Sequence, residues 1–258
     1  MLNLLESDVL SWVSQYFLPL VRLSAFFLSA PIFSVRIVST RIRLVLSLSV
    51  TILIVPILPA VPLIDGVSLS TAIIIAQQIL IGVALGFTFQ VVFQVFVLTG
   101  QYIAMKLGLG FASMNDPSNG VSVTIVSQFY LLTTTLLFLS FNGHLVLIQI
   151  LVNSFTEIPI GEGGISTSNL YRIVEFGGWM FGSALVISMP VLTALLVVNS
   201  AFGVMSRSAP QMNIFAVGFP ITLIFGLMIM WVGFPAFLFS FEQFVDEGIA
   251  FAITLLTP

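Results

Sequence analysis

The stretch Lys106-Leu-Gly-Leu-Gly-Phe-Ala-Ser-Met-Asn-Asp-Pro-Ser-Asn-Gly120 lies between two long apolar runs, Thr71–Met105 and Val121–Val152. Both runs have the length and composition of membrane helices. The stretch between them is too rich in glycine for regular structure, and Asn115-Asp-Pro117 favours a tight turn. It also contains apolar residues that do not suit a loop in water: Leu107, Leu109, Phe111 and Met114. Because irregular backbone at membrane depth must be buried in protein or line a cavity, we predict a loop packed inside protein.

The composition places the chain in or near a membrane. Of its 258 residues, 59% are hydrophobic and only 7% are charged, and the mean hydropathy is +1.19. A soluble domain has about 25% charged residues. The chain lacks cysteine and has the single histidine His144, which excludes thiolate and multi-histidine metal sites. The net charge of −3 does not indicate nucleic-acid binding, and we expect no cofactor and no metal.

Six apolar segments follow one another without the alternation of a β-barrel, which predicts an all-α fold of about six long, partly broken helices. They are Val9–Ala30, Leu44–Leu58, Thr71–Met105, Val121–Val152, Ile173–Met205 and Ile214–Phe241. The last four exceed the roughly 20 residues that a bilayer span needs. We expect breaks at Pro190, Pro220 and Pro235, and helices that fold back or leave the lipid. Their apolar surface would then be covered by other subunits.

Basic residues gather on the first, third and fifth connections: Arg36, Arg41, Arg43, Lys106 and Arg207. Nearly all acidic residues lie on the opposite side, so these three connections are predicted to face the cytoplasm. Two interpretations of the arginines in the first connection remain open, as anchors of orientation or as a clamp for a substrate.

The third segment has an ordered face of small and amide side chains: Gly82, Gly86, Gln90, Gln94 and Gln101. These residues fall within about 120° at 100° per residue. Such a face favours close helix packing with hydrogen bonds across the contact, and the alternative is a polar stripe that lines a conduit. Gly178-x-x-x-Gly182 in the fifth segment favours packing as well.

Arg22 lies in the middle of an apolar segment and therefore needs a carboxylate, backbone carbonyls or water as partners. A contact between subunits and a polar contact inside the chain are both open. Asn142-Gly-His144 interrupts the fourth segment, and a lone histidine there is typical of a hydrogen-bonded structural residue rather than of a proton relay.

Catalytic patterns are missing from the sequence. It has no Gly-x-Ser-x-Gly motif, no aspartate pair in separate apolar segments and no phosphate-binding loop with its lysine, so we predict that the protein is not an enzyme. A secondary transporter for a small solute is the alternative function, because broken helices suit one. Such a transporter usually has paired ionisable residues at mid-membrane, and here only Arg22 and His144 qualify.

Several local patterns coincide along the chain. They are Arg22-x-x-x-Phe26-x-x-x-Ala30-Pro31-x-Phe33-Ser34, Lys106-Leu-Gly-Leu-Gly-Phe-Ala-Ser-Met-Asn-Asp-Pro117, Asn142-Gly-His-Leu145 and Arg207-Ser-Ala-Pro-Gln-Met-Asn-Ile-Phe-Ala-Val-Gly-Phe-Pro220. Together they resemble the flagellar biosynthetic protein FliR family over nearly the whole chain. Lys106 departs from the family pattern, in which an uncharged residue is expected.

The resemblance implies a subunit of the flagellar type III protein export gate, which helps to form and close the channel for unfolded flagellar proteins. It implies FliP- and FliQ-like subunits and FlhB as partners in a helical assembly. It also implies one membrane-complex domain over residues 1–258, with a FliP-like part over about 1–165 and a FliQ-like part over about 166–258. The expected location is the bacterial inner membrane within the flagellar basal body, with part of the assembly above the membrane plane.

The resemblance also assigns candidate site residues. A pore plug corresponds to Lys106, Leu107, Gly108, Leu109, Gly110, Phe111, Met114, Asp116 and Pro117. A cytoplasmic-side hairpin corresponds to Arg207, Pro210, Gln211, Met212 and Asn213. Methionine and phenylalanine pack adaptably and could part for a polypeptide, and Gly108 and Gly110 would supply hinge freedom.

Overall fold

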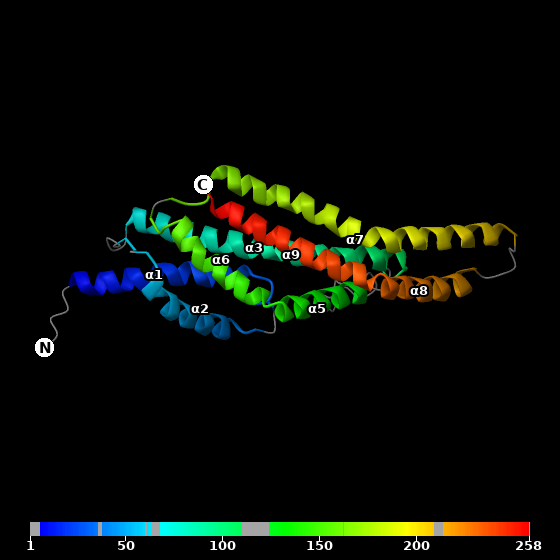
Figure 1. Cartoon of the computed structure of the whole chain (residues 1–258), viewed down its shortest axis with the longest axis horizontal. Helices are drawn as coiled ribbons and strands as arrows, with labels where there is room; N and C mark the ends of the chain where they lie inside the picture. Colours follow the sequence, from blue (N-terminus) through cyan, green and yellow to red (C-terminus); the bar gives the residue numbers. More distant parts are fainter. Residues whose placement is uncertain are drawn as a thin grey trace. The chain divides into compact units, whose positions relative to one another are not determined.

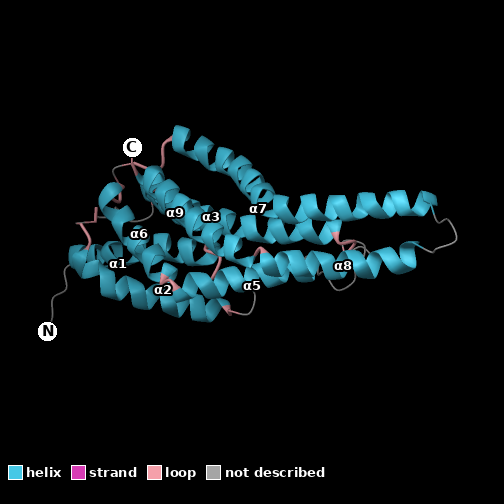
Figure 2. Cartoon of the chain, turned by 45° about the vertical axis from the view of Figure 1, so that its right-hand side comes forward, coloured by secondary structure: helices cyan, strands magenta, loops and turns pink. Residues whose placement is uncertain are grey.

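The computed structural model describes residues 6–35, 38–59, 61–62, 68–109, 124–161, 163–208 and 214–257. Within these ranges every regular element is a helix, so the predicted all-α fold is confirmed (Figures 1 and 2). The elements are α1 (Glu6–Ser29), α2 (Thr40–Ile54), the short 3-10 helix η1 (Val55–Ile57), α3 (Leu69–Lys106), α5 (Ile125–Ser140), α6 (Gly143–Glu157), α7 (Thr167–Ser208), α8 (Ile214–Val232) and α9 (Phe234–Leu256).

Three stretches of the described chain are long and apolar enough to cross a membrane as single helices: Thr40–Ile57, Leu69–Lys106 and Thr167–Arg207. Two bent pairs raise this number to five if each pair is counted as one span. One pair is α5 with α6, bent by 70°, and the other is residues 218–232 with α9, bent by 57°. The fourth and sixth predicted segments are therefore broken helices.

The two breaks have local causes. Asn142 adopts a left-handed conformation with φ of 57°, which asparagine tolerates better than most residues, and it ends the helical path between α5 and α6. Gly233 separates α8 from α9, and Pro235 follows in the first turn of α9, where the missing N–H group needs no partner. The break predicted at Pro235 is thus confirmed to within two residues.

The breaks predicted at Pro190 and Pro220 are wrong. Pro190 lies inside α7 and Pro220 lies inside α8. A proline removes one hydrogen bond of the helix ladder, but apolar helices in membranes tolerate this loss when nearby groups satisfy the freed carbonyl. Each helix continues on both sides of its proline.

The chain consists of two compact units. Unit 1 contains residues 1–91, 138–176 and 247–258, and unit 2 contains residues 92–137 and 177–246. Helices α3, α5, α7 and α9 contribute to both units. The predicted division near residue 165 falls in the connection between α6 and α7 inside unit 1, and the FliP-like and FliQ-like parts stay a prediction.

The core of unit 1 forms where α1 and α3 approach closely. A Cβ atom at Gly82 would lie 2.9 Å from Ala25 Cβ, and one at Gly86 would lie 2.9 Å from the backbone nitrogen of Ala30. Only glycine permits this spacing. The large buried side chains of this core come from α1, α3 and α6: Leu18, Leu23, Phe26, Phe27, Ile81, Leu85, Phe89, Leu151 and Phe155.

The core of unit 2 is aromatic. Phe237 of α9 lies edge-on to Phe96 of α3, with ring centroids 5.5 Å apart, and to Tyr130 of α5 at 5.1 Å. Thr99 Oγ1 donates to the Ala184 carbonyl at 3.3 Å, which joins α3 to α7. Unit 2 therefore holds α3, α5, α7 and α9 together through buried contacts.

Apolar side chains remain exposed on several helices. In the most apolar stretch of α7 only 28% is buried, against 67% in the corresponding stretch of α3. Examples on α7 and α8 are Phe181, Val186, Val197, Phe225 and Trp231. Exposed apolar side chains in such number are covered in a functioning protein by lipid or by another protein chain.

Candidate functional site

The predicted plug begins at the C-terminal end of α3, in unit 2. Lys106 is the last residue of α3 and is exposed, Leu107 is buried, and Gly108 and Leu109 are half-buried. The other predicted plug residues lie outside the described residues: Gly110, Phe111, Met114, Asp116 and Pro117. What the structure describes of the site is therefore the end of α3 and the start of α5, on either side of residues 110–123. We call these two flanking parts together the loop base.

Gly108 ends α3 through a Schellman motif. The Leu109 N–H donates to the Ala104 carbonyl at 3.0 Å, and the Gly108 N–H donates to the Met105 carbonyl at 3.2 Å. Gly108 has φ of 78°, which a side chain would oppose. The residue thus has a defined role as a helix stop, and the hinge motion expected for it stays a prediction.

The Leu107 side chain packs against α8. The Cβ atom that a side chain at Gly226 would carry overlaps Leu107 Cδ2 and lies 3.4 Å from Leu195 Cδ2. At Gly108 an added Cβ would lie 3.3 Å from the Phe219 ring. The end of α3 is therefore fixed by apolar contact with two turns of α8, and Gly226 provides the space for it.

The second part of the loop base is the first turn of α5. Thr124 Oγ1 accepts from the Ser127 N–H at 3.3 Å, which is the hydrogen bond of an N-cap. Ser127 Oγ donates to Gln101 Oε1 of α3 at 3.2 Å. Gly100 permits this approach, because a Cβ there would lie only 2.5 Å from Ser127 Cα. Both parts of the loop base are consequently held together at the last turns of α3.

The glutamines predicted on α3 have different surroundings. Gln101 makes the contact with α5, and Gln94 is half-buried. Gln90 Oε1 is buried without a hydrogen-bond partner among the described residues. Since Gly82 and Gly86 pack on α1 and Gln101 bonds to α5, the contacts at these three positions are those of helix packing. A polar stripe that lines a conduit stays a prediction.

Arg22 forms a second polar site, inside unit 1. Its side chain is fully buried. Its Nε donates to Gln78 Oε1 at 2.8 Å, Nη1 donates to the Ser154 carbonyl at 2.7 Å, and Nη2 donates to the Ile158 carbonyl at 2.9 Å. The guanidinium carbon lies 4.2 Å from the centroid of the Phe155 ring, in cation–π contact.

The contacts of Arg22 stabilise the C-terminal end of α6. Ser154 lies in the last turn of α6 and Ile158 is its C-cap residue. Carbonyls at a helix C-terminus lack partners in the helix and carry partial negative charge, so a buried cation suits them. Of the two alternatives that the sequence leaves open, the described geometry is a polar contact inside the chain, with carbonyls in place of a carboxylate.

A match to a family of known proteins covers most of the chain. Residues 13–248 match the family described as "Bacterial export proteins, family 1". The chain is also 38% identical over 237 residues to the flagellar biosynthetic protein FliR of Pectobacterium carotovorum, covering 91% of this chain and 90% of that protein. The chain belongs to the FliR family.

Other FliR proteins match over similar lengths. The protein of Escherichia coli is 39% identical over 232 residues, which are 89% of this chain and 88% of that protein. The protein of Aquifex aeolicus is 27% identical over 230 residues, which are 89% of this chain and 87% of that protein. The FliR relatives are named as flagellar biosynthetic proteins, and the family description names bacterial export.

Other residues singled out in this FliR-family sequence are placed as follows. Arg207 is exposed near the end of α7, and the remaining hairpin residues lie outside the described residues: Pro210, Gln211, Met212 and Asn213. Arg41 is exposed, whereas Arg43 Nη2 donates to the Val35 carbonyl at 2.8 Å; Arg36 lies outside the described residues. His144 is half-buried, and the described residues contain no group of three histidine, aspartate or glutamate side chains that could hold a metal ion.

Gly178 and Gly182 were expected to pack against a neighbouring helix. Within the described part of the chain, an added Cβ at either position would meet no atom within 4 Å. Sequence reasoning also missed Gly226, Thr124 and Ser127. The only signals for them were an isolated glycine in an apolar run and hydroxyl residues where a helix begins.

Proposed function

We propose that the chain is a subunit of the flagellar type III protein export gate, where it helps to form and close the channel for unfolded flagellar proteins. The observation that carries the proposal is the loop base. Helices α3, α5 and α8 hold both ends of residues 110–123. Gly108 ends α3, and Leu107 packs against Gly226 of α8. Ser127 of α5 donates a hydrogen bond to Gln101 of α3. A short segment that restricts a channel needs such rigid ends, because otherwise its position would not be defined.

The exposed apolar faces support assembly with other chains. Helix α7 is long and mostly uncovered, and Gly178 and Gly182 offer a surface for close helix approach. The proposed partners are FliP- and FliQ-like subunits and FlhB, in the inner membrane within the flagellar basal body. Helices covered by such partners can extend beyond the lipid, which accounts for helices longer than one span.

The transporter alternative is less well supported. A solute carrier places unsatisfied polar or charged groups at its binding site. Arg22 is the fully buried charged residue of the described chain, and its donors already bond to Gln78 and to the carbonyls at the end of α6. It is therefore not free to bind a solute.

Co-expression with FliP- and FliQ-like subunits, followed by mass measurement of the purified complex, tests the proposal. We expect one stable complex that contains all three kinds of chain. A matched pair of variants sharpens the test: Phe181→Glu on the exposed face of α7 should reduce recovery of partners, whereas Tyr171→Glu near the start of the same helix should reduce it less. Purification of the chain as a stable monomer with solute uptake would support the transporter.

A further inference from the structure

Helix α6 is amphipathic, and the outward face of its second half is polar. Leu147, Ile150, Leu151 and Phe155 turn inward and are buried. The exposed positions of its second half are polar: Gln149, Asn153, Thr156 and Glu157. An amphipathic helix of this kind turns its outer face to water or to a polar ligand, and not to hydrocarbon.

A trough runs along this polar face, inside unit 1. A hollow of about 310 Å³ lies between α6 and α9, where Gln149 and Asn153 face Ile249 and Ile253. A second hollow of about 240 Å³ shares the lining residues Glu157, Leu256 and Thr257 with the first, so the two hollows adjoin. We call the two together the trough.

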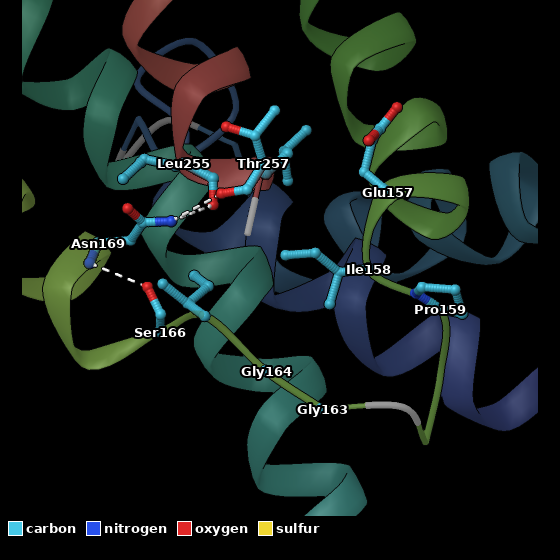
Figure 3. Close-up of a pocket in the computed structure, with 11 residues that line it drawn as sticks. Glu157, Ile158, Pro159, Gly163, Gly164, Ser166, Asn169, Leu255 and Thr257 are labelled. Carbon is cyan, nitrogen blue, oxygen red and sulfur yellow. Dashed lines mark hydrogen bonds between the residues drawn. The ribbon is translucent and has the colours of Figure 1, made fainter.

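The second hollow is built by hydrogen bonds between helix ends (Figure 3). The Asn169 side-chain amide donates to the Thr257 carbonyl at 3.0 Å and to the Leu255 carbonyl at 3.3 Å. The Asn169 N–H donates to Ser166 Oγ at 3.2 Å, which caps the start of α7. The wall of this part of the trough is therefore fixed by the junction of α7 with the end of α9.

The amides in the trough are available to a ligand. Neither Gln149 nor Asn153 has a side-chain hydrogen bond to another described residue. An amide both donates and accepts, which matches the N–H and C=O groups of an extended backbone whatever its side chains are. Gln149 and Glu157 are about 12 Å apart along the helix, at 1.5 Å per residue, which corresponds to three or four residues of extended chain.

We propose that this trough is an aqueous surface of the assembled gate and that it contacts the exported, unfolded polypeptide. The proposal rests on the proposed function, because it supplies the polypeptide. The amides of Gln149 and Asn153 lie beside isoleucine side chains and can bind backbone and apolar side chains weakly and without sequence preference, and Glu157 is the one charged residue among the described residues that line the trough. Such a surface suits a path along which many different chains pass.

Single-cysteine variants test this proposal without background, because the chain has no cysteine of its own. Gln149→Cys and Asn153→Cys are made in cells with the complete export apparatus, and co-purification with the partner subunits shows that each variant assembles. We expect both to react with a water-soluble maleimide and to form a disulfide with a cysteine in a stalled exported chain. Leu151→Cys, which is buried on the same helix, is the control and should do neither.

Three results would overturn the proposal. Absence of maleimide labelling at both positions would place the face in lipid or in a tight contact. A disulfide with a neighbouring subunit alone would make the trough a subunit interface. Labelling without any disulfide to the stalled chain would leave only a water-facing surface. Leu109→Cys at the loop base separates these failures from failure of the proposed function, because its disulfide to the stalled chain would persist if only the trough proposal is wrong.

Discussion

Replacement of Arg22 by methionine tests the Arg22 site, because methionine keeps much of the length and removes every donor. Gln78 Oε1 and the Ile158 carbonyl would lose the partners that they have at 2.8 and 2.9 Å. The Ser154 carbonyl keeps the bond from the Ile158 N–H at 3.1 Å. Each orphaned buried acceptor costs about 1–3 kcal/mol, and loss of the contact with Phe155 adds roughly 1 kcal/mol.

Removal of the buried charge offsets part of this cost, since a guanidinium is itself expensive to bury. We therefore expect Arg22→Met to lower the free energy of unfolding by about 2–4 kcal/mol. For a chain of this size that corresponds to a decrease of roughly 5–15 °C in melting temperature. The measurement is thermal unfolding of the purified complex in detergent.

Two variants provide the controls for this prediction. Arg22→Lys keeps the charge but not the planar fork of donors, so its melting temperature should be intermediate. Arg41→Met removes an exposed arginine and should change the melting temperature little. If Arg22→Met and Arg41→Met melt within about 2 °C of each other, a difference below 1 kcal/mol, the role of Arg22 at the end of α6 is refuted.

Other predictions concern the loop base. Gly226→Ala should destabilise the complex by about 1–3 kcal/mol because its methyl group overlaps Leu107, and Leu107→Ala in the same chain should restore part of the loss, as measured by melting temperature. Gly108→Ala should lower the free energy of unfolding by about 1–2 kcal/mol, because φ at this position is 78°. Gly177→Ala, on the open surface of α7, should not destabilise the complex. Equal melting temperatures of these two variants would contradict the prediction. Thr124→Val should cost about 1 kcal/mol through loss of the α5 N-cap, and unchanged hydrogen exchange in the first turn of α5 would count against the cap.

Hydropathy and turn chemistry predict much of the fold. The helical segments follow from apolar runs too long for loops, and the Asn142-Gly143 pair marks the break of the fourth segment. The errors at Pro190 and Pro220 have one physical origin. Proline weakens a helix locally, but whether the helix ends depends on the packing and hydrogen bonding of its neighbours.

The sites are harder to predict, because their partners carry no sequence signal. Arg22 bonds to carbonyls at the end of α6, and every helix end has such carbonyls. A search of the sequence for carboxylates could not find them. Leu107 and Gly226 are far apart in the chain, and only the tertiary fold shows that the glycine makes room for the leucine.

Ion conductance through the assembled complex tests the central claim most directly. The complex is reconstituted in a planar bilayer, once with the natural chain and once with Gly110–Met114 deleted. Leu185→Ala on the exposed face of α7 serves as the control. The proposed function predicts a closed complex for the natural chain and the control, and a steady ion current for the deletion. An assembled deletion complex that stays as closed as the natural one would contradict it.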